Sequence, residues 1–375
     1  MKSHCYFTLF IALHWLMSAI QFPVAAQDVS QRLELYLRQR EQNTNFSGVA
    51  LVTQAGKTLL RKGYGMADFE LKTPNSPEYV FRIGSVSKPI TAVGILMLHD
   101  RGILKLTDSI DGYFANCPDE WKKVTIHHLL NHTSGVPDFF GALEDAPLKE
   151  TREEIKRVLA ENKSTPLKSP PGGKYKYSNF NYMLLGYLIE IVTKQYWEDF
   201  LVENIFGPLE MVQTRYDDVW EIVVNRAHGY KIRDGELANI PYDDHSAFAA
   251  GGLRSTVDDL NAWHNAFIGG RLVSSELVNL SLQPYVGNYG YGWQVINLFG
   301  RRMHNHTGGI GGFSSHLAYY PSEDLLIILL SNVQNENAKG TACDLARIVF
   351  GVKPAPVAND VWLQKHNTER CGQEQ

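Results

Sequence analysis

The sequence predicts an α+β protein in which one sheet is assembled from both ends of the chain around a helical middle. Strand-like segments gather near the N-terminus, short strands gather again near the C-terminus, and the segments between them have helical periodicity. The chain has 375 residues, a formal net charge of −4, 44% hydrophobic residues and 20% charged residues. This balance is typical of a soluble globular protein with a large core. It excludes disordered and disulfide-framework chains and gives no electrostatic reason to expect a nucleic-acid partner.

The first residues are typical of an export signal. Lys2 supplies a positive start, residues 6–20 are mostly apolar, and Val24-Ala25-Ala26 offers small residues for cleavage before Gln27. We therefore expect residues 1–26 to be a signal peptide and the protein to be exported, either periplasmic or secreted. The alternative is an uncleaved membrane anchor. No later apolar run approaches the length of a bilayer span, so we expect no stable membrane span once the signal is cleaved.

The predicted elements follow in chain order. An amphipathic helix is expected over residues 28–42, where apolar residues recur at helical spacing, and a hairpin follows it. The expected strands are 47–52, 58–62, 291–296, 302–306, 314–320 and 325–331. The expected later helices are 85–99, 125–130, 152–161, 179–200 and 256–267, the last capped by Ser255 or Thr256.

This order predicts a single bilobed domain over residues 27–352. Its sheet lobe is expected from about 27–84 and 252–352, its helical lobe from about 85–251, and a peripheral tail from 353–375. Clefts form preferentially at such lobe boundaries. Three cysteines remain after the signal, Cys117, Cys343 and Cys371, and one disulfide is expected at most, with the pair left open.

The first pattern that could carry chemistry is Ser85-Val86-Ser87-Lys88, at the expected start of a helix. Because three residues are close to one helical turn, Lys88 should lie within reach of the Ser85 hydroxyl. The N–H of Ser85 is an unpaired first-turn donor that can face an oxyanion. A buried Lys88 would lose its charge and could accept a proton. The alternative is a capping serine beside a surface lysine, because the pattern is short.

The second pattern is Tyr177-Ser178-Asn179, which opens the helix expected over 179–200. A tyrosine at such a junction can project into a cleft, where a cationic lysine would lower its pKa and suit it to acid–base chemistry. Asn179 would offer its side-chain amide to a substrate carbonyl. The alternative is a helix cap beside a half-buried tyrosine.

The third pattern is His306-Thr307-Gly308-Gly309, at the end of an expected strand. Glycines let a ligand lie against the strand, and the N–H of Gly309 could complete an oxyanion hole with that of Ser85. His306 can donate a hydrogen bond or, when protonated, attract a carboxylate. The alternative is a glycine-rich turn beside an exposed histidine. Each of the three patterns occurs once, and their ordered combination is more specific than any one.

No metal ion or cofactor is expected. His128 and His132 have a spacing that can bind zinc on a helix, but the segment between them lacks the glutamate of the His-Glu-x-x-His pattern. A structural role is therefore expected for this segment. A Gly-x-Ser-x-Gly elbow is also absent, which disfavours an α/β-hydrolase triad.

Together these residues resemble the serine β-lactamase and penicillin-binding-protein-like hydrolases. The similarity is greatest to the branch that contains class C β-lactamases, D-alanyl-D-alanine carboxypeptidases and related esterases. It extends beyond the three patterns to residues 125–137 and 251–256. The resemblance implies a β-lactamase/transpeptidase-like fold, with an antiparallel sheet flanked by helices and an all-helical lobe.

The resemblance also implies acyl transfer. Ser85 would attack a carbonyl, Lys88 and Tyr177 would move protons with His306 beside them, and water would hydrolyse the acyl-enzyme. The substrate-binding residues would be Asn179, Thr307, Gly308 and Gly309.

One departure bears on the substrate. The β-lactamases of this branch usually place a lysine at the position of His306, whose charge would be only partial near neutral pH. We therefore expect a D-alanyl-D-alanine carboxypeptidase-like enzyme that acts on D-amino-acid peptides. Its substrate would be a small molecule or peptide, such as a peptidoglycan stem peptide or a β-lactam. The alternatives are a β-lactamase or esterase of the same family, and a penicillin-binding sensor that acylates without turnover.

Overall fold

The computed structural model describes residues 28–44, 46–142, 148–240, 247–334 and 336–354. The expected signal peptide (1–26) and nearly all of the expected tail (353–375) lie outside these residues. Within the described ranges, no helix combines the length and the apolar character needed to cross a membrane.

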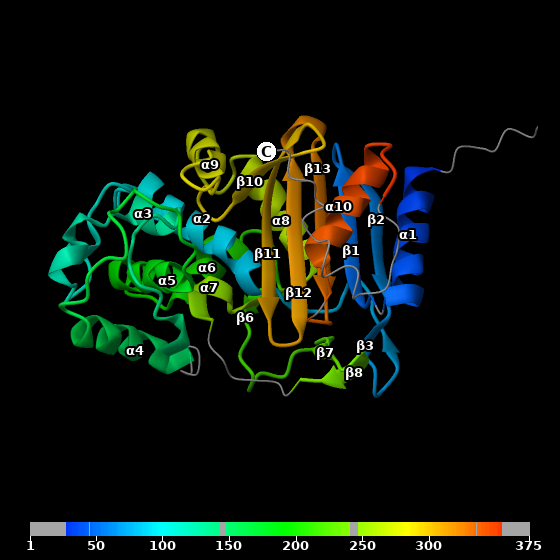
Figure 1. The fold of residues 1–375 in the computed structure, drawn as a ribbon, viewed down its shortest axis with the longest axis horizontal. Helices are drawn as coiled ribbons and strands as arrows, with labels where there is room; N and C mark the ends of the chain where they lie inside the picture. The colour runs from blue at the N-terminus through cyan, green and yellow to red at the C-terminus, as the bar shows by residue number, and fades with distance from the viewer. Residues whose placement is uncertain (1–27, 45, 143–147, 241–246, 335, 355–375) are drawn as a thin grey trace, which may run out of the picture.

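The centre of the fold is a six-stranded antiparallel sheet (Figure 1). Its strands are β1 (Gly48–Gln54), β2 (Lys57–Tyr64), β10 (Gln294–Leu298), β11 (Arg301–Ile310), β12 (Phe313–Tyr320) and β13 (Leu325–Ser331). Their order in space is β10-β11-β12-β13-β1-β2, so the N-terminal hairpin pairs directly with the last strand. The predicted α+β class, with one antiparallel sheet built from both ends of the chain, is confirmed.

Helices cover both faces of this sheet, and a group of helices lies beside it (Figure 1). The helices are α1 (Val29–Thr44), α2 (Ser87–Asp100), α3 (Ile126–Leu130), α4 (Leu148–Glu161), α5 (Asn179–Thr193), α6 (Trp197–Leu201), α7 (Phe248–Gly251), α8 (Val257–Ile268), α9 (Ser275–Leu282) and α10 (Ala338–Val349). The remaining short strands are β3 (Met66–Asp68), β4 (Thr73–Pro74), β5 (Phe81–Arg82), β6 (Arg215–Tyr216), β7 (Tyr230–Arg233), β8 (Glu236–Asn239) and β9 (Leu253–Ser255).

Strand β13 shows why the sheet has helices on both sides. All seven of its residues are buried. Leu325, Ile327 and Leu329 pack into the core formed with α1 and α10. The alternating residues Leu326, Ile328 and Leu330 pack into the larger core that includes α2, α5 and α8. A continuous apolar run of this kind is the expected sequence of a strand that is buried on both faces.

The longest helix expected from the sequence and the last helix of the fold show where the prediction fails. The single helix expected over 179–200 is wrong, because α5 ends at Thr193 and Lys194 adopts a left-handed conformation with φ of 62° before α6 begins at Trp197. An apolar pattern that continues through the break gave no sign of it. Helix α10 was not predicted, although its buried face covers β12 and β13.

The cysteine pairing is partly settled. Cys117 is a free, half-buried thiol, whereas Cys343 on α10 is fully buried and disulfide-bonded. These two residues therefore do not pair with each other. Cys371 lies outside the described residues.

Candidate active site

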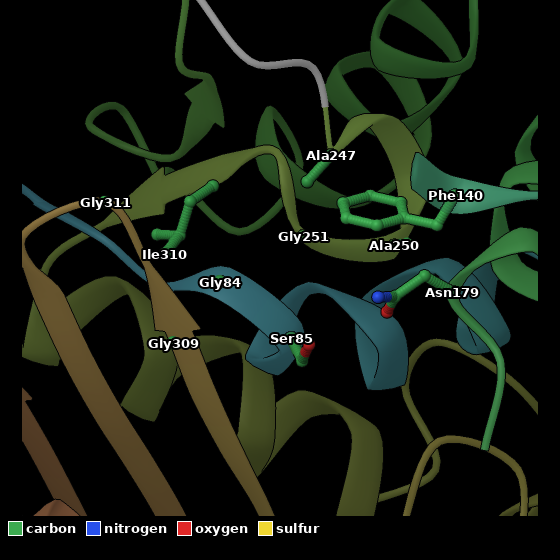
Figure 2. Close-up of a pocket in the computed structure, with 10 residues that line it drawn as sticks. All are labelled: Gly84, Ser85, Phe140, Asn179, Ala247, Ala250, Gly251, Gly309, Ile310 and Gly311. Atoms are coloured by element: carbon green, nitrogen blue, oxygen red, sulfur yellow. The ribbon is translucent and has the colours of Figure 1, made fainter. Parts of the chain in front are cut away.

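Ser85 lies on a one-turn 3₁₀ helix, Gly84–Val86, that leads directly into α2. Gly84 has a φ of +50°, which favours glycine, and a Cβ at this position would come within 2.8 Å of the Gly309 nitrogen. The turn therefore lies in close contact with β11. Ser85 is half-buried and lines a cavity between this turn, the start of α5 and α7 (Figure 2).

Lys88 is completely buried, one turn after Ser85. Its Nζ lies 3.0 Å from Ser85 Oγ, 2.8 Å from Asn179 Oδ1 and 2.6 Å from the Ala250 carbonyl oxygen. Burial holds the pKa of Lys88 well below its ordinary value, and the negative charge of Asp138 opposes this only in part. A neutral amine has two protons for the two carbonyl oxygens, which leaves its lone pair for the Ser85 hydroxyl. The predicted contact between Ser85 and Lys88 is confirmed.

The start of α5 is fixed by two polar side chains. Ser178 is the N-cap, and its hydroxyl accepts a backbone N–H of the first turn. The Asp138 carboxylate accepts the N–H of Asn179 at 3.2 Å and that of Phe180 at 3.1 Å. A carboxylate at this end of a helix is favourable, because the helix dipole is positive there. These bonds place Asn179 with Oδ1 on Lys88 and its amide group at the cavity (Figure 2).

Tyr177 stands just before this cap, and its hydroxyl lies close enough to the Ser85 side chain to interact with it. The Lys88 Nζ lies 4.8 Å from the centre of its ring. The side chain is 37% exposed, but its hydroxyl end is desolvated, and this burial raises the pKa of Tyr177 above its ordinary value. The expectation that a cationic lysine would lower this pKa is wrong, because burial disfavours the lysine charge. Tyr177 therefore stays protonated near neutral pH and can donate a proton.

Strand β11 carries the third pattern past Ser85. A Cβ at Gly308 would lie 2.0 Å from the carbonyl oxygen of Ile83, so only glycine lets the strand approach the nucleophile turn this closely. At Gly309 a Cβ would meet nothing within 4 Å. Gly309 and Ser85 line the same cavity, as expected for two backbone donors to one oxyanion.

His306 is 5% exposed, and both of its ring nitrogens have partners. Nδ1 lies 2.9 Å from the Thr307 carbonyl oxygen, which can only accept, so Nδ1 carries a proton. Nε2 lies 2.9 Å from Tyr289 Oη and, in the neutral ring, accepts that hydroxyl. Burial lowers the pKa of His306 to about 3. The expected partial charge near neutral pH is therefore wrong, and the ring is neutral.

Ser85 lines one pocket and Tyr177 lines a second. The first has a volume of about 210 Å³, and none of its described lining residues is charged (Figure 2). It is lined by Gly84, Ser85, Phe140, Asn179, Ala247, Ala250, Gly251, Gly309, Ile310 and Gly311. The second has a volume of about 170 Å³ and is lined by Tyr175, Tyr177, Tyr289, Gln294, His306 and Thr307.

The sequence did not single out Tyr175, Tyr289 or Asp138. The two tyrosines surround His132, which is 1% exposed and accepts the N–H of Ser178 at Nδ1, 3.2 Å away. The predicted structural role of His132 agrees with this position. Tyr289 contacts His306 across a loop and a strand, and residue spacing gives no sign of such a contact.

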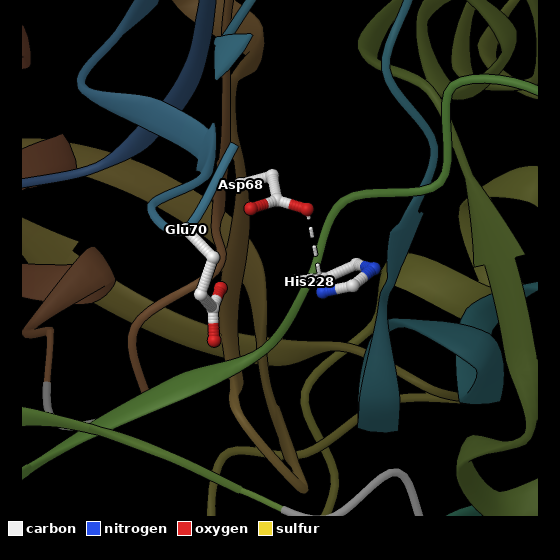
Figure 3. Close-up of side chains that lie close together, drawn as sticks. All are labelled: Asp68, Glu70 and His228. Carbon is white, nitrogen blue, oxygen red and sulfur yellow. Dashed lines mark ion pairs between the residues drawn. The ribbon is translucent and has the colours of Figure 1, made fainter. Parts of the chain in front are cut away.

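One cluster of side chains outside the two pockets has the residue types of a metal site. Single ligand atoms of Asp68, Glu70 and His228 lie within 4.8 Å of one another (Figure 3). His228 Nδ1 faces Asp68 Oδ2 at 3.6 Å, while Glu70 accepts hydrogen bonds from Tyr230 and Asn239. Protein donors therefore satisfy Glu70, and none of the three residues lines either pocket.

A family model described as Beta-lactamase matches residues 33–350. The chain belongs to this family. The match includes every element of the two pockets, so the resemblance to serine β-lactamases and penicillin-binding proteins is confirmed, as is the β-lactamase/transpeptidase-like fold. Members of this family are serine hydrolase-like proteins that act on small-molecule or peptide substrates.

Several individual proteins are similar to this Beta-lactamase family member. Penicillin-binding protein 4* of Bacillus subtilis (strain 168) is 28% identical over 340 residues, which cover 83% of this chain and 73% of that protein. The octameric penicillin-binding protein homologue from Pyrococcus abyssi superposes with a TM-score of 0.78 at 26% identity, covering 86% of this chain and 78% of that one. D-amino acid amidase from Ochrobactrum anthropi SV3, complexed with D-phenylalanine, superposes with a TM-score of 0.71 at 22% identity. The superposition covers 86% of this chain and 98% of the amidase chain. The last likeness is one of fold.

Proposed function

We propose that this protein is a serine hydrolase that forms an acyl-enzyme on Ser85 and acts on D-amino-acid peptides or amides. The observation that carries the proposal is the contact of Ser85 with two different proton carriers. Lys88 is a buried amine with a lowered pKa, and Tyr177 is a buried hydroxyl with a raised one. Groups whose environments push their pKa values apart are suited to act as base and acid in one site.

In the acylation step, Ser85 Oγ attacks the substrate carbonyl and passes its proton to the lone pair of Lys88. The carbonyl oxygen becomes an oxyanion, which the N–H groups of Ser85 and Gly309 stabilise. The bond from the carbonyl carbon to the leaving group then breaks. Tyr177 gives its proton to the leaving group, and the proton held by Lys88 returns to Tyr177.

Deacylation repeats these steps with water. Water takes the place of the leaving group beside Tyr177 and passes a proton to the neutral Lys88 amine as it attacks the ester carbonyl. The bond from the carbonyl carbon to Ser85 Oγ then breaks, the acid is released, and Lys88 returns the proton to Ser85 Oγ. Asn179 holds the Lys88 amine through Oδ1 and leaves its amide N–H₂ free to orient the acyl group. Thr307 and Gly308 shape the strand along which the substrate lies.

The D-amino-acid substrate is supported by the related proteins. Penicillin-binding protein names recur among the relatives, and the amidase of similar fold was complexed with D-phenylalanine. The D-alanyl-D-alanine carboxypeptidase expected from the sequence is one form of this activity, in which the leaving group is an amino acid with a free carboxylate.

A substrate panel with a nucleophile control tests the proposal. The panel contains a D-alanyl-D-alanine peptide, a D-amino acid amide, the matching L-amino acid amide, an aryl ester and a chromogenic β-lactam. We expect hydrolysis of at least one D-configured substrate in preference to its L-counterpart, and its loss in Ser85→Ala with the fold retained. Hydrolysis that survives in Ser85→Ala overturns the proposal. Fast turnover of the β-lactam alone would make the protein a β-lactamase, and a stable adduct without turnover would make it a sensor.

A further inference from the structure

In the proposed function Tyr177 is the acid that protonates the leaving group, and its position shows on which side of Ser85 the leaving group must lie. This inference therefore rests on the proposed function. A leaving group that takes its proton from Tyr177 has to contact the Tyr177 hydroxyl. Tyr177 lines the 170 Å³ pocket and is not among the residues that line the 210 Å³ cavity. The acyl group is therefore assigned to the larger cavity and the leaving group to the smaller pocket.

Tyrosine rings form the walls of the smaller pocket. The ring centres of Tyr175 and Tyr289 are 5.6 Å apart, and those of Tyr177 and Tyr289 are 6.3 Å apart. Gly287, with a φ of +76°, supports Tyr175 from behind, because a Cβ there would lie 2.3 Å from its ring carbon Cγ. The rings are thus held by packing, as in a built subsite.

The charged residues of the same loop point elsewhere. Lys174 and Lys176 alternate with Tyr175 and Tyr177, and both lysines are exposed to solvent and do not line the pocket. In an extended segment alternate side chains face opposite sides. This alternation turns the tyrosines inward and the lysines outward.

His306 completes the pocket as a neutral ring. The Thr307 carbonyl oxygen fixes a proton on Nδ1, and the Tyr289 hydroxyl occupies Nε2. Tyr289 is itself buried at 1% exposure, so it holds the ring at a fixed place. The other lining side chains are tyrosines, Gln294 and Thr307, and none of the described lining residues bears a full charge.

We propose that the pocket lined by Tyr175, Tyr177, Tyr289 and His306 selects substrates whose leaving group is an uncharged amide or ester unit of about one ring in size. A carboxylate entering it would lose its hydration and gain no cation in return, which is costly. The faces of aromatic rings are also electron-rich and disfavour an anion. The size follows from the volume, since a cavity of about 150 Å³ accommodates benzene. An uncharged pocket of this size therefore favours the substrate of an amidase or esterase over a substrate that ends in a free carboxylate.

Two matched dipeptides test the inference. N-acetyl-D-alanyl-D-phenylalaninamide and N-acetyl-D-alanyl-D-phenylalanine have the same acyl group and the same ring, and differ only in the terminal carboxamide or carboxylate. We expect kcat/KM to be at least about tenfold higher for the carboxamide, and both activities to vanish in Ser85→Ala. Ser85-dependent cleavage that is equal or faster for the free acid overturns the inference while leaving the proposed function intact. Cleavage that persists in Ser85→Ala overturns the proposed function instead.

The source of the preference is tested by charge substitutions. His306→Lys places a cation in the pocket and is expected to reduce the carboxamide preference at least about tenfold. The control Lys174→Ala/Lys176→Ala removes the two exposed lysines and is expected to leave the preference unchanged. A preference that is insensitive to His306→Lys, or that changes in the control, contradicts the assignment to this pocket.

A binding measurement without the nucleophile separates recognition in this pocket from the chemical step. D-Phenylalaninamide and D-phenylalanine, the leaving groups of the two matched dipeptides, are compared by isothermal titration calorimetry on the Ser85→Ala variant, in which neither compound is turned over. We expect the amide to bind at least about tenfold more tightly. Equal binding, or tighter binding of the acid, overturns the inference.

Discussion

The Nζ atom of Lys88 lies 3.0 Å from Ser85 Oγ and also contacts the side-chain oxygen of Asn179 and the backbone carbonyl oxygen of Ala250. This arrangement satisfies a neutral amine, whose two protons and one lone pair match the three partners. A charged ammonium would lose hydration at this buried position, which is why the pKa of Lys88 falls. The fold thus prepares a base beside the nucleophile before any substrate binds.

Lys88→Met should abolish acylation while preserving the fold. The methionine has a similar length and fills the buried space, but it cannot accept the Ser85 proton. We expect the rate to fall at least about 10⁴-fold, which is the scale seen when one member of a catalytic unit is removed. Steady-state kinetics give the loss, and circular dichroism and the melting temperature control for folding. Activity within about tenfold of the wild type would rule out Lys88 as the base.

Tyr177→Phe should affect substrates according to their leaving group. An amide leaves only after it gains a proton, so we expect its kcat to fall about 10²- to 10⁴-fold. A p-nitrophenyl ester leaves without a proton, so its acylation should fall much less. Pre-steady-state bursts with the ester and turnover of the amide measure the two effects. An equal loss for both substrates would indicate that Tyr177 only supports the structure.

Gly308→Ala and Gly309→Ala form a matched pair on β11. The Cβ of an alanine at 308 would lie 2.0 Å from the Ile83 carbonyl oxygen and would push the strand away from the Ser85 turn. The Cβ of an alanine at 309 would meet nothing within 4 Å, and its N–H is retained. We expect Gly308→Ala to lower both activity and melting temperature, and Gly309→Ala to lower the melting temperature little. A melting temperature that is lower for Gly309→Ala than for Gly308→Ala would contradict the close contact between β11 and the turn.

The free energy of unfolding should decrease in acid, in part because of His264. This residue is 2% exposed, lies between Trp293 and Tyr319, and has a pKa that burial lowers to about 3. Since the unfolded chain binds a proton at this histidine near pH 6.5 and the folded chain does not, stability decreases as the pH falls from about 6.5 towards 3. One such group contributes up to about 1.4 kcal/mol per pH unit over this range.

His264→Phe isolates this contribution. The ring is retained between its two aromatic neighbours, while the titration is removed. We expect urea unfolding at pH 7 and pH 5 to show a smaller difference in unfolding free energy for the variant than for the wild type. An unchanged difference would show that His264 does not contribute.

Much of the site could be predicted because its chemistry is local in sequence. Ser85 and Lys88 are one helical turn apart, and Gly308 and Gly309 follow His306 directly, so spacing alone places each group. The alternation of Leu325 to Leu330 between two cores likewise follows from a strand that is buried on both faces.

The charge states could not be predicted, because they depend on burial by distant elements. Tyr289, which lies 17 residues before His306 in the sequence, contacts the His306 ring and fixes its tautomer. Asp138, on a different loop, holds the start of α5. Neither contact has a spacing rule. Helix α5 ends at Lys194 because this residue adopts a left-handed conformation. Such a conformation is uncommon for a lysine, so the sequence does not predict it.

Acid-quenched intact-mass spectrometry of the wild-type protein mixed with excess D-configured amide or ester substrate tests the central claim most directly. The account predicts a transient mass increase equal to the acyl group, located on Ser85 by peptide mapping and absent in Ser85→Ala. An adduct on another residue, or undiminished turnover by Ser85→Ala, would contradict it.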